Sequence, residues 1–128
     1  MRLRELDARL YRIERRPDTW TELRDGQQVQ ISGTRSYYHE AATLADAQGV
    51  MFLCPKCYAE NGGPVGTHMV LCWFAGRGVP EDEAPLPGRW NPSGTGIEDL
   101  TFVGPGAASV LLTAGCCWHG FVRNGEAA

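Results

Sequence analysis

The residues best suited to chemistry are five cysteines and three histidines. Cys54 and Cys57 are separated by two residues, and Cys116 and His119 repeat that spacing. Two intervening residues let both side chains point at one ion from a turn, whose backbone N–H groups can donate to the sulfurs. Four such ligands close a tetrahedral site and leave no position for water. We therefore predict one structural Zn²⁺ ion, bound by Cys54, Cys57, Cys116 and His119.

The cysteines leave two alternatives open. Cys117 directly follows Cys116, and adjacent residues of a strand point to opposite sides, so only one of the two is expected to bind the ion. The two-residue spacing favours Cys116. Cys-x2-Cys is also the spacing of a redox dithiol, although the sequence lacks the βαβ context of a thioredoxin-like domain. The remaining cysteine, Cys72, lies within an alternating apolar stretch and is predicted to be a small core residue.

A serine and a histidine offer a second chemistry, nucleophilic catalysis. Ser109 follows a run of small residues at the start of a predicted strand. A serine hydroxyl acts as a nucleophile when a histidine base lies within hydrogen-bonding reach. His68, which opens another predicted strand, is the candidate base or an alternative metal ligand. The simpler interpretation is that Ser109 is structural and that His68 bonds to the backbone. His39 lies in a polar stretch and is predicted to be a surface residue.

Length and composition favour one small domain of β structure. The chain has 128 residues, of which 43% are hydrophobic, with 16 glycines and 8 prolines. Such a length fits a single domain over residues 1–128, and so many turn-forming residues argue against a helical bundle. We predict a mostly β (α+β) fold with a zinc-knuckle or zinc-ribbon-like site and short helical segments. Residues 50–125 form the zinc-binding β core, and residues 1–45 form an N-terminal extension of uncertain structure.

Apolar periodicity predicts the elements that position these side chains. Leu3, Leu6, Leu10 and Ile13 recur at helical spacing, which favours a helix over residues 3–15; a strand over residues 8–14 is the alternative. Pro17 is expected to end either element. Further strands are predicted at residues 29–31, 50–53, 67–74 and 100–103, with a hairpin built from 108–112 and 118–123. Residues 76–96 are predicted to form a surface loop, and the tail from residue 124 is expected to fray.

Several segments resemble a family of small phage and prophage proteins of unknown function. They are FLCPKC (52–57), NGGPVGTH (61–68), CW (72–73), GRWNPSGTG (88–96), LTF (100–102), ASV (108–110) and CCWHGFVRNG (116–125). The likeness covers about residues 50–125. Members often carry the label "ammonia monooxygenase", which the sequence does not support, because it has neither a membrane segment nor a recognisable copper site.

The wider family includes the predicted deconjugating peptidase of bacterial ubiquitin-like operons. Its pattern has a cysteine pair, a Pro-Ser-[Ile/Val] step and a Cys-x-x-His-[aromatic] segment that ends in glycine. The likeness implies that Ser109 is the nucleophile and His119 the histidine of the site. The sequence departs from the pattern at Ala108, where the family has proline, and at Gly120, where it has an aromatic residue.

The same likeness bears on the metal ligands. In some phage relatives the cysteine directly precedes the histidine, which leaves the third ligand open. If His119 is instead the catalytic base, the ion must take His68, Cys72 or Cys117.

Two functions are consistent with these observations. The first is a small zinc-binding, phage-type protein with an accessory or structural role, in which zinc stands in for a larger core. The second is a zinc-stabilised serine peptidase or isopeptidase-like hydrolase that uses Ser109 with His119 or His68. The sequence favours the first, because it identifies no carboxylate that would orient the histidine; Asp99 and Glu98 are the nearest candidates.

The expected partners and location follow from charge and family. We expect a protein partner or a peptide substrate and no membrane. The net charge of −3 and the pI near 5.6 argue against nucleic acid. Residues 1–5 contain no apolar signal segment, so we expect a cytoplasmic location. The resemblance implies that the cytoplasm is that of a bacterial host, or that the location is the virion if the role is structural.

Overall fold

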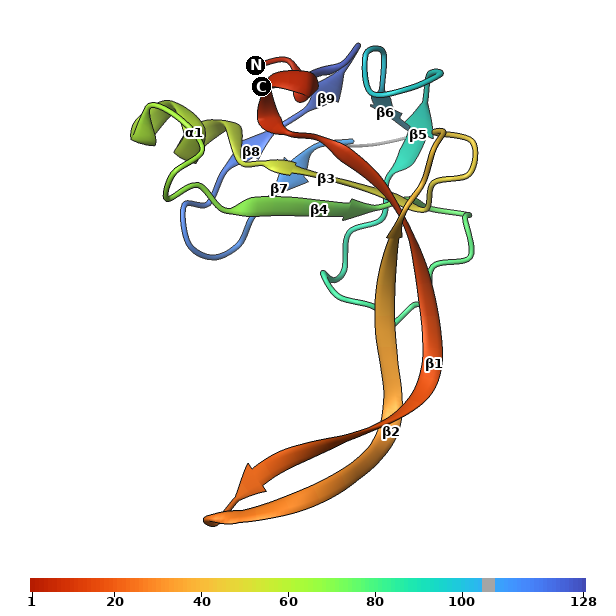
Figure 1. Ribbon diagram of the computed structural model, residues 1–128. Coiled ribbons are helices and arrows are strands. Elements are labelled where there is room, and N and C mark those ends of the chain that lie inside the picture. Colours follow the sequence, from red (N-terminus) through yellow and green to blue (C-terminus); the bar gives the residue numbers. More distant parts are fainter. Residues whose placement is uncertain (105–107) are drawn as a thin grey trace.

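The four-stranded antiparallel sheet of β2, β1, β3 and β4, in that order, is the largest element of the fold (Figure 1). The computed structural model describes residues 1–104 and 108–128. The sheet strands are β1 (Arg9–Arg24), β2 (Gln27–Glu40), β3 (Gly49–Leu53) and β4 (Met69–Trp73). The 3-10 turn η1 (Leu3–Leu6) precedes them, and α1 (Pro55–Asn61), a short α-helix, connects β3 to β4. The predicted mostly β class with short helical segments is confirmed.

Three two-stranded ladders complete the body of the molecule. They pair β5 (Asn91–Ser93) with β6 (Thr101–Val103), β7 (Val110–Leu111) with β8 (His119–Gly120), and β9 (Val122–Arg123) with β10 (Glu126–Ala127). The strands predicted at 50–53, 67–74 and 100–103 correspond to β3, β4 and β6. The predicted hairpin of 108–112 and 118–123 is present in shorter form as β7 and β8. The predicted surface loop over 76–96 also holds β5.

The N-terminal extension is a long β-hairpin that projects from the body (Figure 1). Its register runs from Tyr11 opposite Glu40 to Arg24 opposite Gln27, and Asp25 and Gly26 make the turn with positive φ angles. A two-residue turn of this kind matches the twist of paired strands. Outside the body, the ribbon is held by cross-strand pairing and by arginines stacked on aromatic rings, such as Arg35 over Trp20 at 4.2 Å.

The helix predicted over residues 3–15 is wrong beyond Leu6. Only the first turn is helical, and β1 begins at Arg9, so the alternative strand over 8–14 is the better description. Leu3 and Leu6 point into the core, and Leu10 continues that apolar contact from the strand. Apolar spacing alone therefore could not distinguish a helix from a turn followed by a strand. Pro17 does not end the element, because the free edge of a two-stranded ribbon tolerates a residue without an N–H.

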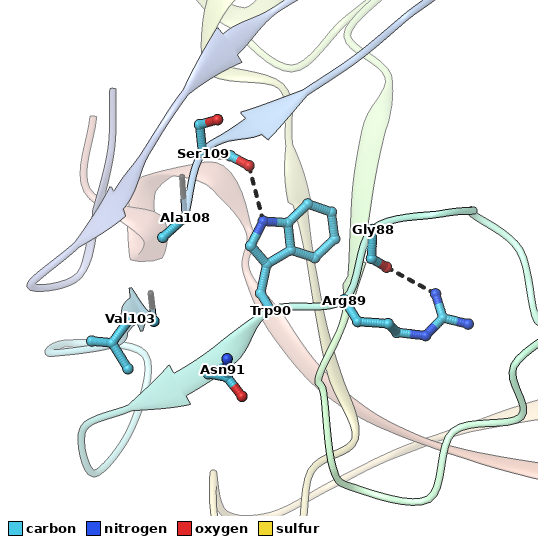
Figure 2. A pocket seen from close by; sticks show the side chains of 8 residues that line it. Gly88, Arg89, Trp90, Asn91, Val103, Ala108 and Ser109 are labelled. Carbon is cyan, nitrogen blue, oxygen red and sulfur yellow. Dashed lines mark hydrogen bonds between the residues drawn. The ribbon is translucent and has the colours of Figure 1, made fainter. Parts of the chain in front are cut away.

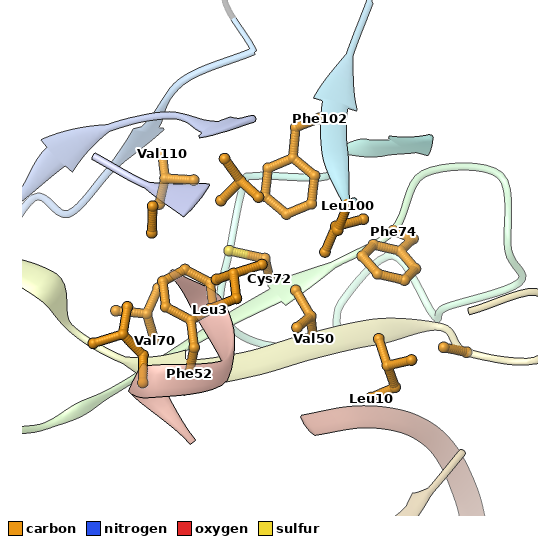
Figure 3. Packing of buried hydrophobic residues seen from close by; sticks show 14 of the residues in the cluster. Leu3, Leu10, Val50, Phe52, Val70, Cys72, Phe74, Leu100, Phe102 and Val110 are labelled. Atoms are coloured by element: carbon orange, nitrogen blue, oxygen red, sulfur yellow. The ribbon is translucent and has the colours of Figure 1, made fainter. Parts of the chain in front are cut away.

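The hydrophobic core lies between the β3–β4 pair and the C-terminal ladders (Figure 3). Val50 and Phe52 of β3 and Val70 and Cys72 of β4 alternate into it and are all at most 3% exposed. Cys72 is thus a core residue, as predicted, and its burial raises the pKa of its thiol. The covering residues include Leu3, Leu6, Leu100, Phe102, Val110, Trp118, Val122 and Ala127.

The prediction that the tail frays from residue 124 is wrong. Residues 122–127 form a hairpin, and Ala127 is fully buried. The Ala127 N–H donates to the Met1 carbonyl oxygen, and the Met1 ammonium donates back to the Ala127 carbonyl oxygen, each at 2.9 Å. The two ends of the chain therefore hold each other, which the local sequence of the tail does not reveal.

Gly125→Ala is expected to destabilise the fold far more than Gly26→Ala. Both glycines have a φ of +76°, so each substitution carries the strain of a side chain in the left-handed region, about 1–2 kcal/mol. A Cβ at Gly125 would also lie 2.2 Å from the Glu98 carbonyl oxygen, whereas a Cβ at Gly26 meets nothing within 4 Å. Urea unfolding of both variants measures the difference, and equal losses would contradict the close packing of the C-terminal hairpin.

Candidate metal centre

Four residues from separate elements meet at one end of the sheet. Cys54 follows β3 directly, and Cys57 lies in the first turn of α1. His68 immediately precedes β4, and Cys116 lies in the turn between β7 and β8. The β3–β4 pairing continues to Cys54, whose N–H donates to the His68 carbonyl oxygen at 2.9 Å. The Lys56 ammonium donates to the Cys116 carbonyl oxygen at 2.7 Å and so fastens the turn to the helix.

The ligand atoms of these four residues have the spacing of a zinc site. All lie within 4.8 Å of one another. The Cys54 and Cys116 sulfurs are 3.6 Å apart, and His68 Nε2 is 3.3 Å from the Cys116 sulfur. Zn–S and Zn–N bonds of about 2.3 and 2.0 Å in a tetrahedron place two sulfurs about 3.8 Å apart and a sulfur and nitrogen about 3.5 Å apart. Three thiolates and one imidazole are also ligands that zinc prefers, so the cluster could hold a metal ion such as zinc.

Hydrogen bonds around the cluster orient its ligands. His68 Nδ1 lies 3.2 Å from the Met69 carbonyl oxygen. With a metal ion bound, the imidazole proton would lie on Nδ1 and the Nε2 lone pair would face the sulfurs. Without the ion, Nε2 can carry the proton instead and donate it to the Cys116 sulfur. The backbone N–H groups of Cys57 and Lys56 donate to the Cys54 sulfur. This is the turn geometry expected of a Cys-x2-Cys zinc knuckle.

The thiols of the cluster differ in acidity. The hydrogen bond from His68 lowers the pKa of Cys116 to about 7, helped by the Trp118 N–H. Desolvation raises the pKa of Cys57 to about 12 and also raises that of Cys54. Cys116 is therefore the first of the three to become a thiolate. Zinc must displace the protons of the other two, so its affinity is expected to fall as the pH is lowered.

The predicted ligand set needs one correction, at the histidine. The cluster contains His68, and His119 lies outside it. His119 is exposed on β8, and its ring packs near Phe121 with centroids 6.2 Å apart. Side chains alternate along a strand, and because the preceding Trp118 points into the core, His119 points the other way.

The three predicted cysteines lie together in the cluster, which contains Cys116 and not Cys117. Cys117 is exposed, and its thiol faces the Gly115 carbonyl oxygen instead. The sequence offers His68 as an alternative ligand but does not place it beside Cys54. Only the pairing of β3 with β4 as a hairpin makes Cys54 and His68 neighbours.

Ser109 lies just before β7, between two cavities. Its carbonyl oxygen accepts a hydrogen bond from Trp90 Nε1 at 3.0 Å, beside a pocket of about 220 Å³ (Figure 2). On the other side, Ser109 and His68 both line a groove of about 610 Å³. No hydrogen bond joins the Ser109 hydroxyl to a histidine in the part of the chain that the structure describes. His39 is on the surface, as predicted, 3.0 Å from Glu14.

Comparisons with protein-family models, with curated proteins and with solved structures gave no match. Among residues 1–104 and 108–128, no helix has the length and apolar character needed to cross a membrane. The cluster and the groove beside it are therefore the features of the molecule that indicate its function.

While a chelator removes the zinc at pH 7 and before the chain unfolds, we expect Cys116 to react with iodoacetamide before Cys54 and Cys57. The thiolate is the reactive form, and only Cys116 among the three has a pKa near 7. His68→Gln removes the main cause of that low pKa and should slow the labelling of Cys116, whereas His119→Gln should not. Peptide mass mapping at short reaction times gives the order. Equal labelling of the three ligand cysteines would contradict the proposed role of His68.

Proposed function

We propose that the protein is a small zinc-binding, phage-type accessory or structural protein in which one Zn²⁺ ion is structural. The observation that carries the proposal is the cluster of Cys54, Cys57, His68 and Cys116, with all ligand atoms within 4.8 Å. Four protein ligands complete a tetrahedral shell, and a closed shell favours a structural rather than a catalytic ion.

The position of the cluster supports a structural role. It joins the end of β3, the start of α1, the start of β4 and the β7–β8 turn. β7 and β8 have two residues each, too few to hold that turn on their own. Zinc bound by such ligands contributes an apparent free energy on the order of 10 kcal/mol, which is comparable to the net stability of a small domain.

The hydrolase is the weaker alternative. Ser109 and His68 line one groove, which supports it. However, His68 Nε2 faces the Cys116 sulfur, and a nitrogen that binds zinc cannot accept a proton from serine. His119 is exposed on β8, where its ring lies beside that of Phe121. The geometry therefore supports a binding or structural role over catalysis by Ser109.

A fluorophosphonate probe is expected to leave the folded, zinc-bound protein unlabelled. Such probes react with serines that a base has activated. In the proposed site His68 binds zinc and cannot act as a base for Ser109. Intact mass measures labelling, with a known serine hydrolase as the positive control. Labelling that is lost in Ser109→Ala would favour the hydrolase instead.

We expect one zinc ion per chain, retained by native protein and lost on chelation together with the folded state. Native mass spectrometry gives the stoichiometry, and circular dichroism follows unfolding. Cys116→Ser and His68→Gln should each lower zinc affinity and Tm strongly, because each removes one of the four ligands.

The chain offers matched controls for both substitutions. Cys117→Ser and His119→Gln make the same chemical changes at neighbouring exposed residues and should leave zinc content and Tm nearly unchanged. Folded protein that holds no zinc, or a larger loss in His119→Gln than in His68→Gln, would contradict the proposed site.

A further inference from the structure

We propose that the groove between β4 and β7 binds an extended, apolar segment of a protein partner, which adds to the free edge of β4 as a strand. The inference goes beyond the zinc site and does not require that the protein be an enzyme. It rests on three features of the groove: an unpaired strand edge, walls without charge, and a residue of the chain that already pairs at one end.

The outer edge of β4 presents free backbone groups. In the part of the chain that the structure describes, the order β2-β1-β3-β4 leaves one side of β4 without a neighbouring strand. The Cys54 N–H donates to the His68 carbonyl oxygen, and the Phe74 N–H donates to the Gln48 carbonyl oxygen. In an antiparallel pair the backbone groups of successive residues point alternately toward and away from the partner strand, so those of Val70 and Cys72 bond to β3. The N–H and C=O groups of Leu71 then point outward, and nothing in residues 1–104 or 108–128 bonds to them.

The groove runs along this edge. It has a volume of about 610 Å³, within the range of about 300–1,000 Å³ that is typical of ligand clefts. Consecutive residues of each wall line it, 68–71 on one side and 109–114 on the other. Side chains on one face of a strand would appear at every second position, so consecutive lining residues indicate that the groove meets the edges of the strands.

The opposite wall also offers a strand edge. The Leu112 N–H donates to the Trp118 carbonyl oxygen, and Val110 pairs with Gly120, so both bond toward β8. The N–H and C=O groups of Leu111 therefore point away from β8. A strand in the groove would lie between the edge of β4 and the edge of β7 and would join the four-stranded sheet to the β7–β8 ladder.

One residue of the chain already pairs in this way. The Trp90 N–H donates to the Trp73 carbonyl oxygen at 3.1 Å, and the Ala75 N–H donates to the Trp90 carbonyl oxygen at 2.7 Å. The Trp90 indole then bonds across to Ser109 on the opposite wall (Figure 2). The chain thus spans the gap at one end and leaves the N–H and C=O groups of Leu71 open. Toward His68, the Met69 carbonyl oxygen is already bonded by His68 Nδ1.

The chemistry of the walls selects the occupant. Among the described residues that line the groove, none is acidic, lysine or arginine, and Leu86 and Leu111 are 55% and 57% exposed. Such walls favour apolar side chains on an uncharged segment, while the backbone groups of β4 require an extended conformation. Strand addition of this kind takes affinity from the main chain and specificity from alternate side chains. An open apolar edge of this kind otherwise promotes aggregation.

The test selects a binder from a phage-displayed library of random twelve-residue peptides, using the zinc-loaded full-length protein. The selected peptide is synthesised, and its Kd is measured by fluorescence anisotropy. Leu111→Glu and Leu71→Pro should each weaken binding at least about tenfold. The first places a charge in the wall, and the second removes an outward N–H. Leu23→Glu, at the tip of the β1–β2 hairpin and 74% exposed, is the matched control and should change the Kd less than about twofold.

Amide hydrogen exchange by NMR tests the mode of binding. In the free protein, the Leu71 amide should exchange fast and the Val70 and Cys72 amides slowly. The peptide should protect Leu71 and leave the other two unchanged. Leu111→Glu keeps the backbone of β4 intact, so its effect on the Kd tests binding in the groove even if Leu71→Pro does not fold.

Three outcomes would overturn the proposal. The first is that the library yields no specific binder, meaning no labelled peptide that its unlabelled form displaces. The second is that a bound peptide leaves the Leu71 amide unprotected from exchange. The third is protection of Leu71 in free protein that rises with protein concentration, alongside a dimer in sedimentation, because a second copy would then be the occupant. Zinc content is measured on the same samples, and the three results count only for zinc-loaded protein, so failure of the zinc site is distinguished from failure of the groove.

Discussion

The antiparallel register of β3 and β4 is the constraint on which the rest of the body depends. It brings the residue after one strand, Cys54, against the residue before the next, His68. The helix between them returns Cys57 to the same point, and Cys116 arrives from the far end of the chain. A shift of one residue would turn Val70 and Cys72 out of the core and separate the ligands. Core packing and the metal site therefore specify the same pairing.

The projecting hairpin is tied to the body by a buried carboxylate. Glu83, in the loop after β4, is 7% exposed and accepts hydrogen bonds from Ser36 and Arg15 of the two hairpin strands. Arg89 donates to the carbonyl oxygen of the same residue at 2.8 Å. A buried carboxylate needs such partners, because unpaired charge is costly away from water. The same loop contributes residues 85–88 to the lining of the groove, so the hairpin connects the N-terminal region to the proposed binding surface.

The sequence predicts the parts of the site that depend on local spacing and misses those that depend on pairing. The spacing of Cys54 and Cys57, the choice of Cys116 and the core position of Cys72 follow from local patterns. The fourth ligand does not, because only the hairpin of β3 and β4 places His68 there and only strand alternation turns His119 away. The N-terminal leucines similarly fit a helix until pairing with β2 and β3 is known. The buried tail depends on Met1, more than a hundred residues away.

Extended X-ray absorption fine structure at the zinc edge reports the ligands of the bound ion and so tests the proposed coordination. We expect three sulfur scatterers at about 2.3 Å and one imidazole nitrogen at about 2.0–2.1 Å. The imidazole signal should disappear in His68→Gln and persist in His119→Gln. A first shell with two sulfurs, with oxygen, or with an imidazole that depends on His119 would contradict the site and the register that builds it.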